Sequence, residues 1–212
     1  MTKAFAVAAV AGLGSVSAAN AGLIDFTDPA VVAGISGNTL TGSNWTLTGN
    51  PSDLSLTAAT PGPGALGPLK GKTDGIGIKD DEITFPKESL TLTFNYAVKV
   101  TSLYFLDLFF GAGGTEYALL SVDGVPVGAA PAQQFNPGVG NTNPGFAAFN
   151  GLSLIGTVFT FTVGSTNDLT TRLDKPDYAL AGVEIAPVPL PAGVLLLGTA
   201  LAGLGLARRR KA

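Results

Sequence analysis

Hydrophobic and polar residues alternate along the middle of the chain with the period of two that is typical of β-strands. In Leu90–Phe94, apolar side chains occupy every second position and threonines the positions between. The Asp123-Gly124 pair separates two apolar runs and predicts a tight hairpin. No part of the middle has a convincing helical period. The expected strands are Leu23–Phe26, Trp45–Thr48, Leu54–Thr57, Leu90–Phe94, Val98–Phe110, Tyr117–Val122, Val125–Val127, Val158–Val163 and Tyr178–Ile185.

These strands predict an all-β fold, and their short lengths and Gly-rich turns favour a jelly-roll-like antiparallel β-sandwich. An immunoglobulin-like sandwich is the alternative, although the chain has no cysteine for the Cys–Trp–Cys framework of that fold. The middle of the chain is long enough to bury a single core. In a sandwich, we expect the first and last strands, which carry Asp25 and Glu184, to lie near each other.

Two long loops interrupt the pattern, at residues 60–75 and 128–150. Loops longer than about 12–15 residues are usually functional or mobile. The second loop combines aromatic rings, which suit the C–H faces of a sugar, with amides that bond its hydroxyls. The alternative is that its phenylalanines fold back over the core. The candidate glycan-binding residues are Gln133, Gln134, Phe135, Phe146 and Phe149.

The first 21 residues have the features of a secretory signal peptide. Lys3 supplies a positive charge, a short apolar run follows, and Ala19 and Ala21 fit the small-x-small rule for cleavage after residue 21. The apolar run is short for a membrane span of about 20 residues. We therefore expect the chain to be exported.

The other end of the chain predicts a single transmembrane helix. The uncharged residues from Val188 to Ala207 are enough to cross the roughly 30 Å hydrocarbon core as a helix. A basic cluster follows at once, and such clusters stay on the cytoplasmic side, which places the main body outside. The cluster consists of Arg208, Arg209, Arg210 and Lys211.

The C-terminal segment 187–212 resembles a known sorting signal. Its VPLPA motif, apolar helix and terminal RRRK follow in the order of the VPLPA variant of the PEP-CTERM signal, whose more common form has Glu in place of Leu190. The resemblance implies recognition by exosortase, a membrane-embedded cysteine protease or transpeptidase of Gram-negative bacteria, and processing near the prolines. It also implies delivery to the cell surface or exopolysaccharide matrix. The motif residues are Val188, Pro189, Leu190, Pro191, Ala192 and Gly193.

Composition excludes several kinds of chemistry. The chain has no Cys and no His, so disulfides, cysteine or histidine metal ligands and a Ser-His-Asp triad are excluded. Five of its 12 cations lie in the two terminal segments, whereas all 15 acids lie between them. The central domain, 22–186, thus holds seven cations and has a formal charge of −8, against −3 for the whole chain. We expect no nucleic-acid partner, because such partners require a basic patch.

Carboxylates remain the candidates for metal binding. Four acids cluster ahead of the strand that contains Leu90, and adjacent acids repel one another unless they are solvated or hold a cation. Calcium, which takes six to eight oxygens, is the cofactor hypothesis. A solvated acidic edge that hinders aggregation is the alternative, with no cofactor. The candidate ligands are Asp74, Asp80, Asp81 and Glu82.

The favoured function is therefore that of an exported, non-enzymatic structural or adhesive β-sandwich of the cell surface or matrix, with exosortase, the secretion machinery, the membrane and extracellular polysaccharide as partners. A calcium-dependent carbohydrate-binding module is the first alternative. A carboxylate-based glycoside hydrolase is the second, because Asp107, Glu116 and Glu184 lie within or beside expected strands. Nothing else in the sequence supports an enzyme, and we assign no catalytic residue.

Overall fold

The computed structural model describes residues 22–56, 65–80, 82–111, 114–135, 143–165, 176–188 and Ala200. The expected signal peptide, the sorting motif from Pro189 onward and the basic tail lie outside these residues. Within the part of the chain that is described, no helix combines the length and the apolar character that a membrane crossing requires.

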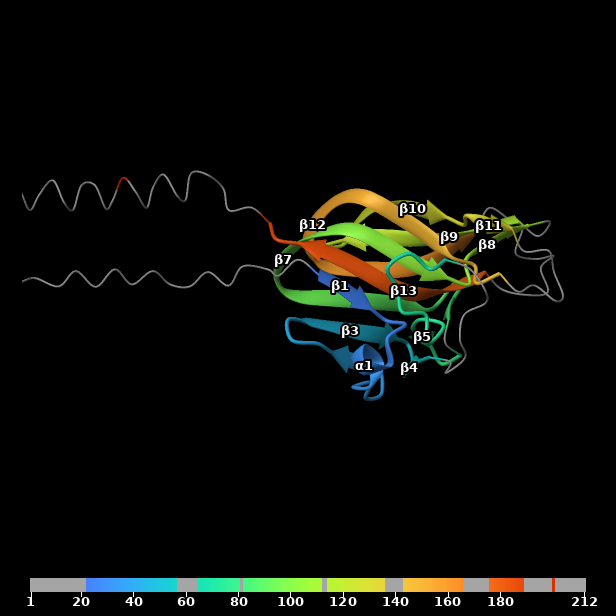
Figure 1. Ribbon diagram of the computed structural model, residues 1–212, viewed down its shortest axis with the longest axis horizontal. Helices are drawn as coiled ribbons and strands as arrows, with labels where there is room; N and C mark the ends of the chain where they lie inside the picture. Colours follow the sequence, from blue (N-terminus) through green and yellow to red (C-terminus); the bar gives the residue numbers. More distant parts are fainter. Residues whose placement is uncertain are drawn as a thin grey trace, which may run out of the picture.

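The described residues form an antiparallel all-β fold with one helical turn (Figure 1). The exception to the antiparallel pairing is β11, which runs parallel to β8. The elements are β1 (Gly22–Asp25), α1 (Pro29–Val32), β2 (Thr39–Thr41), β3 (Trp45–Asn50), β4 (Leu54–Ser55), β5 (Gly77–Ile78), β6 (Ile83–Thr84), β7 (Ser89–Leu106), β8 (Phe109–Gly111), β9 (Gly114–Val122), β10 (Val125–Pro131), β11 (Gln134–Phe135), β12 (Ala147–Ser165) and β13 (Asp177–Ala186).

Two long strands, β7 and β12, each contribute to both halves of a strongly curled sheet. Residues 89–94 of β7 pair with β3, whereas residues 99–106 pair with β13. The later part of β12 pairs with both β7 and β9, and β10 extends this half at its edge. Register shifts in β12 between Asn150 and Leu154 and between Gly156 and Val158 mark where the strand bends. The resulting halves are β2-β3-β7-β12-β9-β10 and β1-β13-β7-β12.

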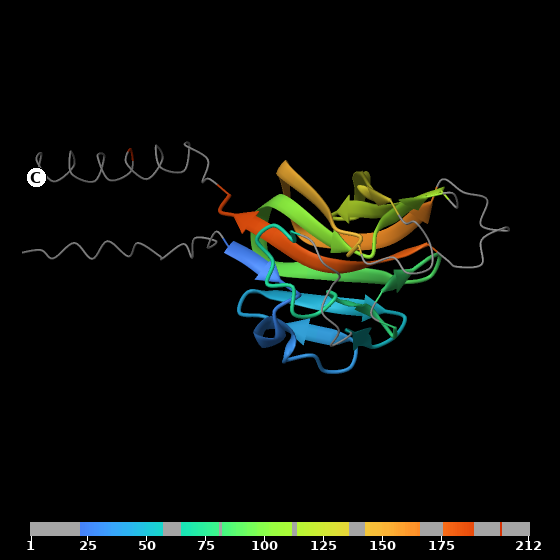
Figure 2. The same cartoon turned by 45° about the vertical axis from the view of Figure 1, so that its right-hand side comes forward.

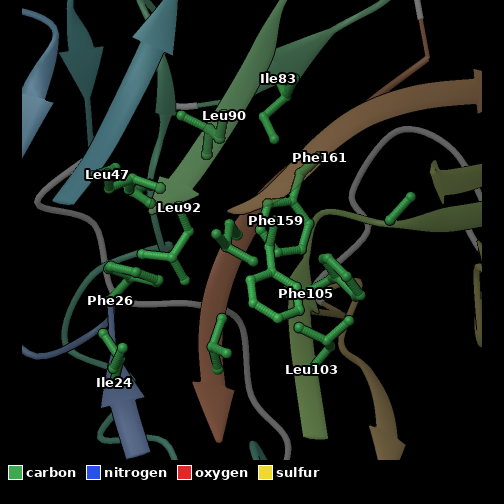
Figure 3. Close-up of a cluster of buried hydrophobic side chains, with 14 of the residues drawn as sticks. Ile24, Phe26, Leu47, Ile83, Leu90, Leu92, Leu103, Phe105, Phe159 and Phe161 are labelled. Carbon is green, nitrogen blue, oxygen red and sulfur yellow. The ribbon is translucent and has the colours of Figure 1, made fainter. Parts of the chain in front are cut away.

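The hydrophobic core lies between these two halves (Figure 3). Phe105, from the half that contains β13, contacts Phe161 of the other half edge to face, with ring centroids 6.4 Å apart. Tyr178 is fully buried beside Phe105 and donates its hydroxyl to the Thr162 carbonyl at 3.0 Å. Burial raises the pKa of Tyr178 well above its ordinary value. The all-β sandwich expected from the alternating pattern is therefore present.

The first and last strands pair along one edge, as expected, with Gly22 opposite Ile185. A clamp of hydrogen bonds then fixes the segment from residue 65 to 73 against β1. The buried Asp25 carboxylate accepts from the Lys70 amide at 2.8 Å and from the Thr27 amide at 2.9 Å. Asp28 caps α1 and pairs with the Lys70 ammonium. This hydrogen-bonded partner lowers the pKa of Asp28, and the carboxylate raises that of Lys70.

Some sequence expectations are confirmed and others are wrong. The hairpin at Asp123-Gly124 is present, with φ values of 49° and 80° that suit a two-residue turn. The expected loop 128–150 is wrong in its described part, because β10 continues to Pro131, β11 follows, and β12 already begins at Ala147. The expected strands at 90–94 and 98–110 are joined into β7, which ends at Leu106. The full length of β10 was not predicted, because small residues such as Gly128 and Ala129 do not produce an alternating apolar pattern.

Candidate functional site

Large apolar side chains that remain exposed mark the candidate sites, because a soluble domain buries most of them. Two aromatic rings lie where β7 ends and β8 begins, and three aliphatic side chains lie at the opposite end. One leucine lies on β9 between the two groups. Among the described residues these side chains are Phe110, Leu119, Val125, Val127, Phe135 and Ile155.

The two exposed aromatic rings, which we call the aromatic pair, are Phe110 of β8 and Phe135 of β11. Their ring centroids are 5.7 Å apart with an interplanar angle of 62°. Phe110 is 37% exposed and Phe135 is 51% exposed. The strands that carry them are neighbours, with Phe135 opposite Phe110. The pair therefore presents adjacent, differently tilted apolar faces to solvent.

The two glutamines that precede Phe135 hold it in place. Gln133 receives the Ala148 amide at 3.2 Å and donates to the Ala148 carbonyl at 3.1 Å. Gln134 receives the Phe146 amide at 3.1 Å. These side chains act as a substitute strand along the start of β12. Their amides support the aromatic pair and are engaged within the chain.

A tight backbone crossing supports the same end of the molecule. The Asp107 amide donates to the Pro144 carbonyl at 3.0 Å, and the Leu108 amide to the Gly145 carbonyl at 3.1 Å. Asp107 itself has a φ of 55°, and Gly145 has a φ of 59°. A Cβ on Gly145 would lie 2.6 Å from the Asp107 Cα. Only glycine fits this crossing, which places β8 beside the segment leading to β12.

A buried carboxylate stabilises β8 from below. Glu116 of β9 is 3% exposed, and its Oε2 accepts the Phe109 amide at 2.8 Å. The carboxylate therefore fixes the backbone next to Phe110, and it is removed from solvent.

The other aromatic candidates of the loop are packed within the fold. Phe149 contacts Phe105 of the core, with centroids 6.0 Å apart. Phe146 stacks on Tyr104, with an interplanar angle of 5° and a centroid distance of 6.2 Å. Of the aromatic candidates for glycan binding, Phe135 is therefore the exposed one, and the structure adds Phe110 to the candidates. The sequence did not single out Phe110, although adjacent phenylalanines at 109 and 110 of a strand must face opposite sides.

A polar row crosses the outer face near Tyr104. Ser102 donates to the Glu184 carboxylate at 2.6 Å, and the Tyr104 hydroxyl donates to the Asn150 side chain at 3.3 Å. Burial raises the pKa of Tyr104, and the nearby Glu184 carboxylate acts in the same direction. Tyr104 is only 4% exposed. This row therefore organises the sheet face beneath Phe146 and offers little surface to a ligand.

Two of the acidic candidates for calcium, Asp80 and Glu82, lie between β5 and β6. The Ile78 amide donates to the Glu82 carbonyl at 2.8 Å, which closes this turn, and Asp80 is exposed. Asp74 precedes β5, and Asp81 lies outside the described residues. No group of three or more acidic, histidine or cysteine side chains among the described residues is arranged to hold a metal. The calcium hypothesis stays a prediction.

Of the three carboxylates considered for hydrolysis, Glu184 lies apart from Asp107. Glu184 is held by Ser102 on the outer face, whereas Asp107 follows the end of β7. Asp107 lies five residues after Ser102, and five steps along a strand correspond to roughly 17 Å. A glycosidase pair is separated by about 5–10 Å, so Glu184 and Asp107 do not meet that requirement.

Comparisons with known proteins return distant structural likenesses alone. No family model matches, and no curated protein matches. The chain has 12% identity to a structure of CBM32-3 from a family 31 glycoside hydrolase of Clostridium perfringens, covering 73% of this chain and 90% of that one, with a TM-score of 0.29. CpGH89CBM32-5 from Clostridium perfringens, in complex with GalNAc-β-1,3-galactose, has 14% identity, coverages of 63% and 94%, and a TM-score of 0.25.

Proposed function

We propose that this chain is an exported, non-catalytic protein of the cell surface or exopolysaccharide matrix. In this proposal the terminal segments direct export, anchoring and processing by exosortase. The β-sandwich, which we take to be jelly-roll-like, binds extracellular polysaccharide through the aromatic pair.

The observation that carries the proposal is that the two ends of the chain leave the domain on one side and the aromatic pair lies on the other. β1 begins and β13 ends side by side at one end, which we call the tail end (Figures 1 and 2). The aromatic pair lies toward the other end, beyond the point where β7 meets the start of β13. Residues 99–106 of β7 alone separate the two ends by roughly 23 Å. A chain held by its C-terminal segment would present Phe110 and Phe135 away from the anchor.

The chemistry of the aromatic pair suits a sugar. Rings at an angle to each other offer apolar faces to the C–H surfaces of pyranose units, as aromatic residues do in many ligand sites. The domain charge of −8 favours neutral glycans, because an acidic polymer would need a bridging cation. The ligand class that we propose is therefore a neutral, matrix-type polysaccharide.

Two measurements test the proposal. Intact-mass analysis of the mature protein from its native host should show loss of residues 1–21 and of the C-terminal RRRKA. A mature pool that retains RRRKA would contradict processing. A glycan array probed with the full chain in detergent should show binding to neutral glycans, with and without a calcium chelator. An array without any bound glycan would refute the binding function.

A further inference from the structure

We propose that, in the anchored precursor, the tail end of the domain rests on the bilayer surface, with Val125, Val127 and Ile155 in contact with lipid. This inference rests on the proposed function, because it requires the C-terminal segment to be in the membrane. It adds an orientation and an interaction surface, the aliphatic patch, defined as these three residues.

The aliphatic patch lies where the chain leaves the fold. Ala186, the last residue of β13, is opposite Lys99 of β7, and Lys99 is opposite Ile155 of β12. These three residues form one row across neighbouring strands. Ile155 is 52% exposed, although it is a large aliphatic side chain. The point at which the tail begins is therefore two strands away from an exposed isoleucine.

The β9–β10 hairpin brings the valines to the same end. Gly156 lies directly against Val122 and Asp123, since a Cβ there would collide with the Val122 side chain. Asp123 Oδ1 accepts the Val158 amide at 2.9 Å and the Thr157 amide at 3.0 Å. Val125, which follows this turn, is 63% exposed, and Val127 is 43% exposed.

The tail is short enough to keep this end near the membrane. Ala192 lies six residues after Ala186 and within the uncharged run of the tail. Six extended residues span at most about 20 Å. The residues that face the bilayer are then set by the fold itself. Lys99 lies in the same row as Ile155, and its alkyl stem can lie along apolar neighbours while its ammonium reaches the lipid headgroups.

An apolar groove of about 160 Å³ continues the patch inward from Val127. Leu152, Leu154 and Phe149 line its other wall. No charged residue lines this groove. Lipid acyl chains require no hydrogen bonds, so such a wall suits hydrocarbon.

The edge of β10 disfavours a protein strand as the occupant. The Ala132 amide donates to the Glu116 carbonyl at 3.0 Å. The backbone N–H and C=O groups of Glu116, and of every second residue of β9 after it, therefore point toward β10. By the register, Pro126, Ala129 and Pro131 then direct their backbones away from β9. Two of these three positions lack an N–H donor. A strand added here would find few partners, whereas a lipid surface needs none.

Site-specific fluorescence in membranes tests the orientation. The chain has no native cysteine, so single-cysteine variants take one label each. The full chain would be reconstituted into vesicles of phosphatidylethanolamine and phosphatidylglycerol and carry an environment-sensitive dye at Ile155→Cys, Leu119→Cys or Phe135→Cys. We expect a blue-shifted label at 155 that nitroxide lipids quench severalfold more than the labels at 119 and 135.

The outcomes separate this inference from the proposed function. Protein that carbonate washing removes from the vesicles would refute membrane anchoring, and with it both proposals. Protein that resists carbonate but has a label at 155 as water-accessible as that at 135 would overturn the orientation alone. A shielded label at 155 that lipid nitroxides do not quench would assign the patch to a second copy of the chain, and would also overturn it.

Discussion

Asp123 shows how one side chain joins two strands of the fold. Its Oδ1 accepts from the amides of Thr157 and Val158 and from the Thr157 hydroxyl at 2.9 Å. These bonds hold the β9–β10 turn against the bend of β12. Hydrogen bonds from the Val158 and Thr157 amides lower the pKa of Asp123, because they stabilise its charged form.

The lowered pKa predicts a loss of stability in acid. A carboxylate whose folded pKa is below its unfolded value stabilises the fold above about pH 4, and this contribution disappears as the pH falls further. We expect Asp123→Asn to lower the urea midpoint at pH 7 and to lessen the difference between pH 7 and pH 3. Urea titrations at both values check this. An equal pH dependence in both proteins would contradict the role of Asp123.

Gly145 is the residue at which space and backbone conformation coincide. Its Cβ would meet the Asp107 Cα, and its φ is positive. Gly151 has a φ of 72°, but a Cβ there would have no atom within 4 Å, so this residue isolates the backbone cost. We expect Gly151→Ala to cost about 1–2 kcal/mol, and Gly145→Ala to cost more and also to weaken glycan binding. Thermal denaturation and the glycan array provide the measurements. Equal losses of stability in the two variants would contradict the steric constraint that we assign to Gly145.

At the scale of elements, the sequence predicted strands where side chains alternate and failed where the fold depends on backbone alone. Leu90–Phe94 and the Asp-Gly hairpin follow from local pattern. The extension of β12 back to Ala147 depends on backbone pairing of residues 147–150 with residues 102–105 of β7, which no local period encodes. The same limit applies to the site: Phe135 could be nominated from its loop, but its partner Phe110 comes from a strand pairing between distant residues.

The prolines of β10 predict how the sheet edge avoids other chains. Exposed edge strands are templates for pairing, and proline removes the donors. We expect the double variant Pro126→Val, Pro131→Thr to form dimers or larger species while the parent in the same detergent does not. Light scattering coupled to size exclusion measures this. Pro29→Ala, at the start of α1, is the matched control and should leave the mass unchanged. An unchanged mass in the double variant would show that the prolines do not protect the edge.

At the scale of the whole molecule, one core links the two halves of the sheet. Phe105 contacts Phe149, Phe161 and Tyr178, which come from both halves. We expect Phe105→Ala to lower the free energy of unfolding by about 3–5 kcal/mol, against a typical total of about 5–15 kcal/mol. Phe135→Ala removes an equal ring that is half exposed and contacts Phe110, and it should lower the free energy of unfolding by no more than about 1.5 kcal/mol. Chemical denaturation compares them, and similar losses would contradict this division between core and surface.

The exposed apolar residues differ in kind between the two ends of the molecule. Aromatic rings lie away from the point where the chain leaves the fold, and aliphatic side chains lie beside it. In the proposed precursor, this division places a lipid-facing surface and a sugar-facing surface on opposite ends of one domain. The terminal segments that motivate the arrangement are predicted from the sequence alone, whereas the arrangement itself required the pairing of β1, β7, β12 and β13.

The most direct test of this account is the affinity of the full chain for its host's extracellular polysaccharide. Titration calorimetry in detergent would compare three proteins: the wild type, a double variant that carries both Phe110→Ala and Phe135→Ala, and the control Leu119→Ala. Leu119 is a suitable control because its side chain is 37% exposed, as is that of Phe110. If the aromatic pair binds the polysaccharide, the double variant loses at least tenfold in affinity while Leu119→Ala binds like the wild type. Equal affinity of all three proteins would contradict this account.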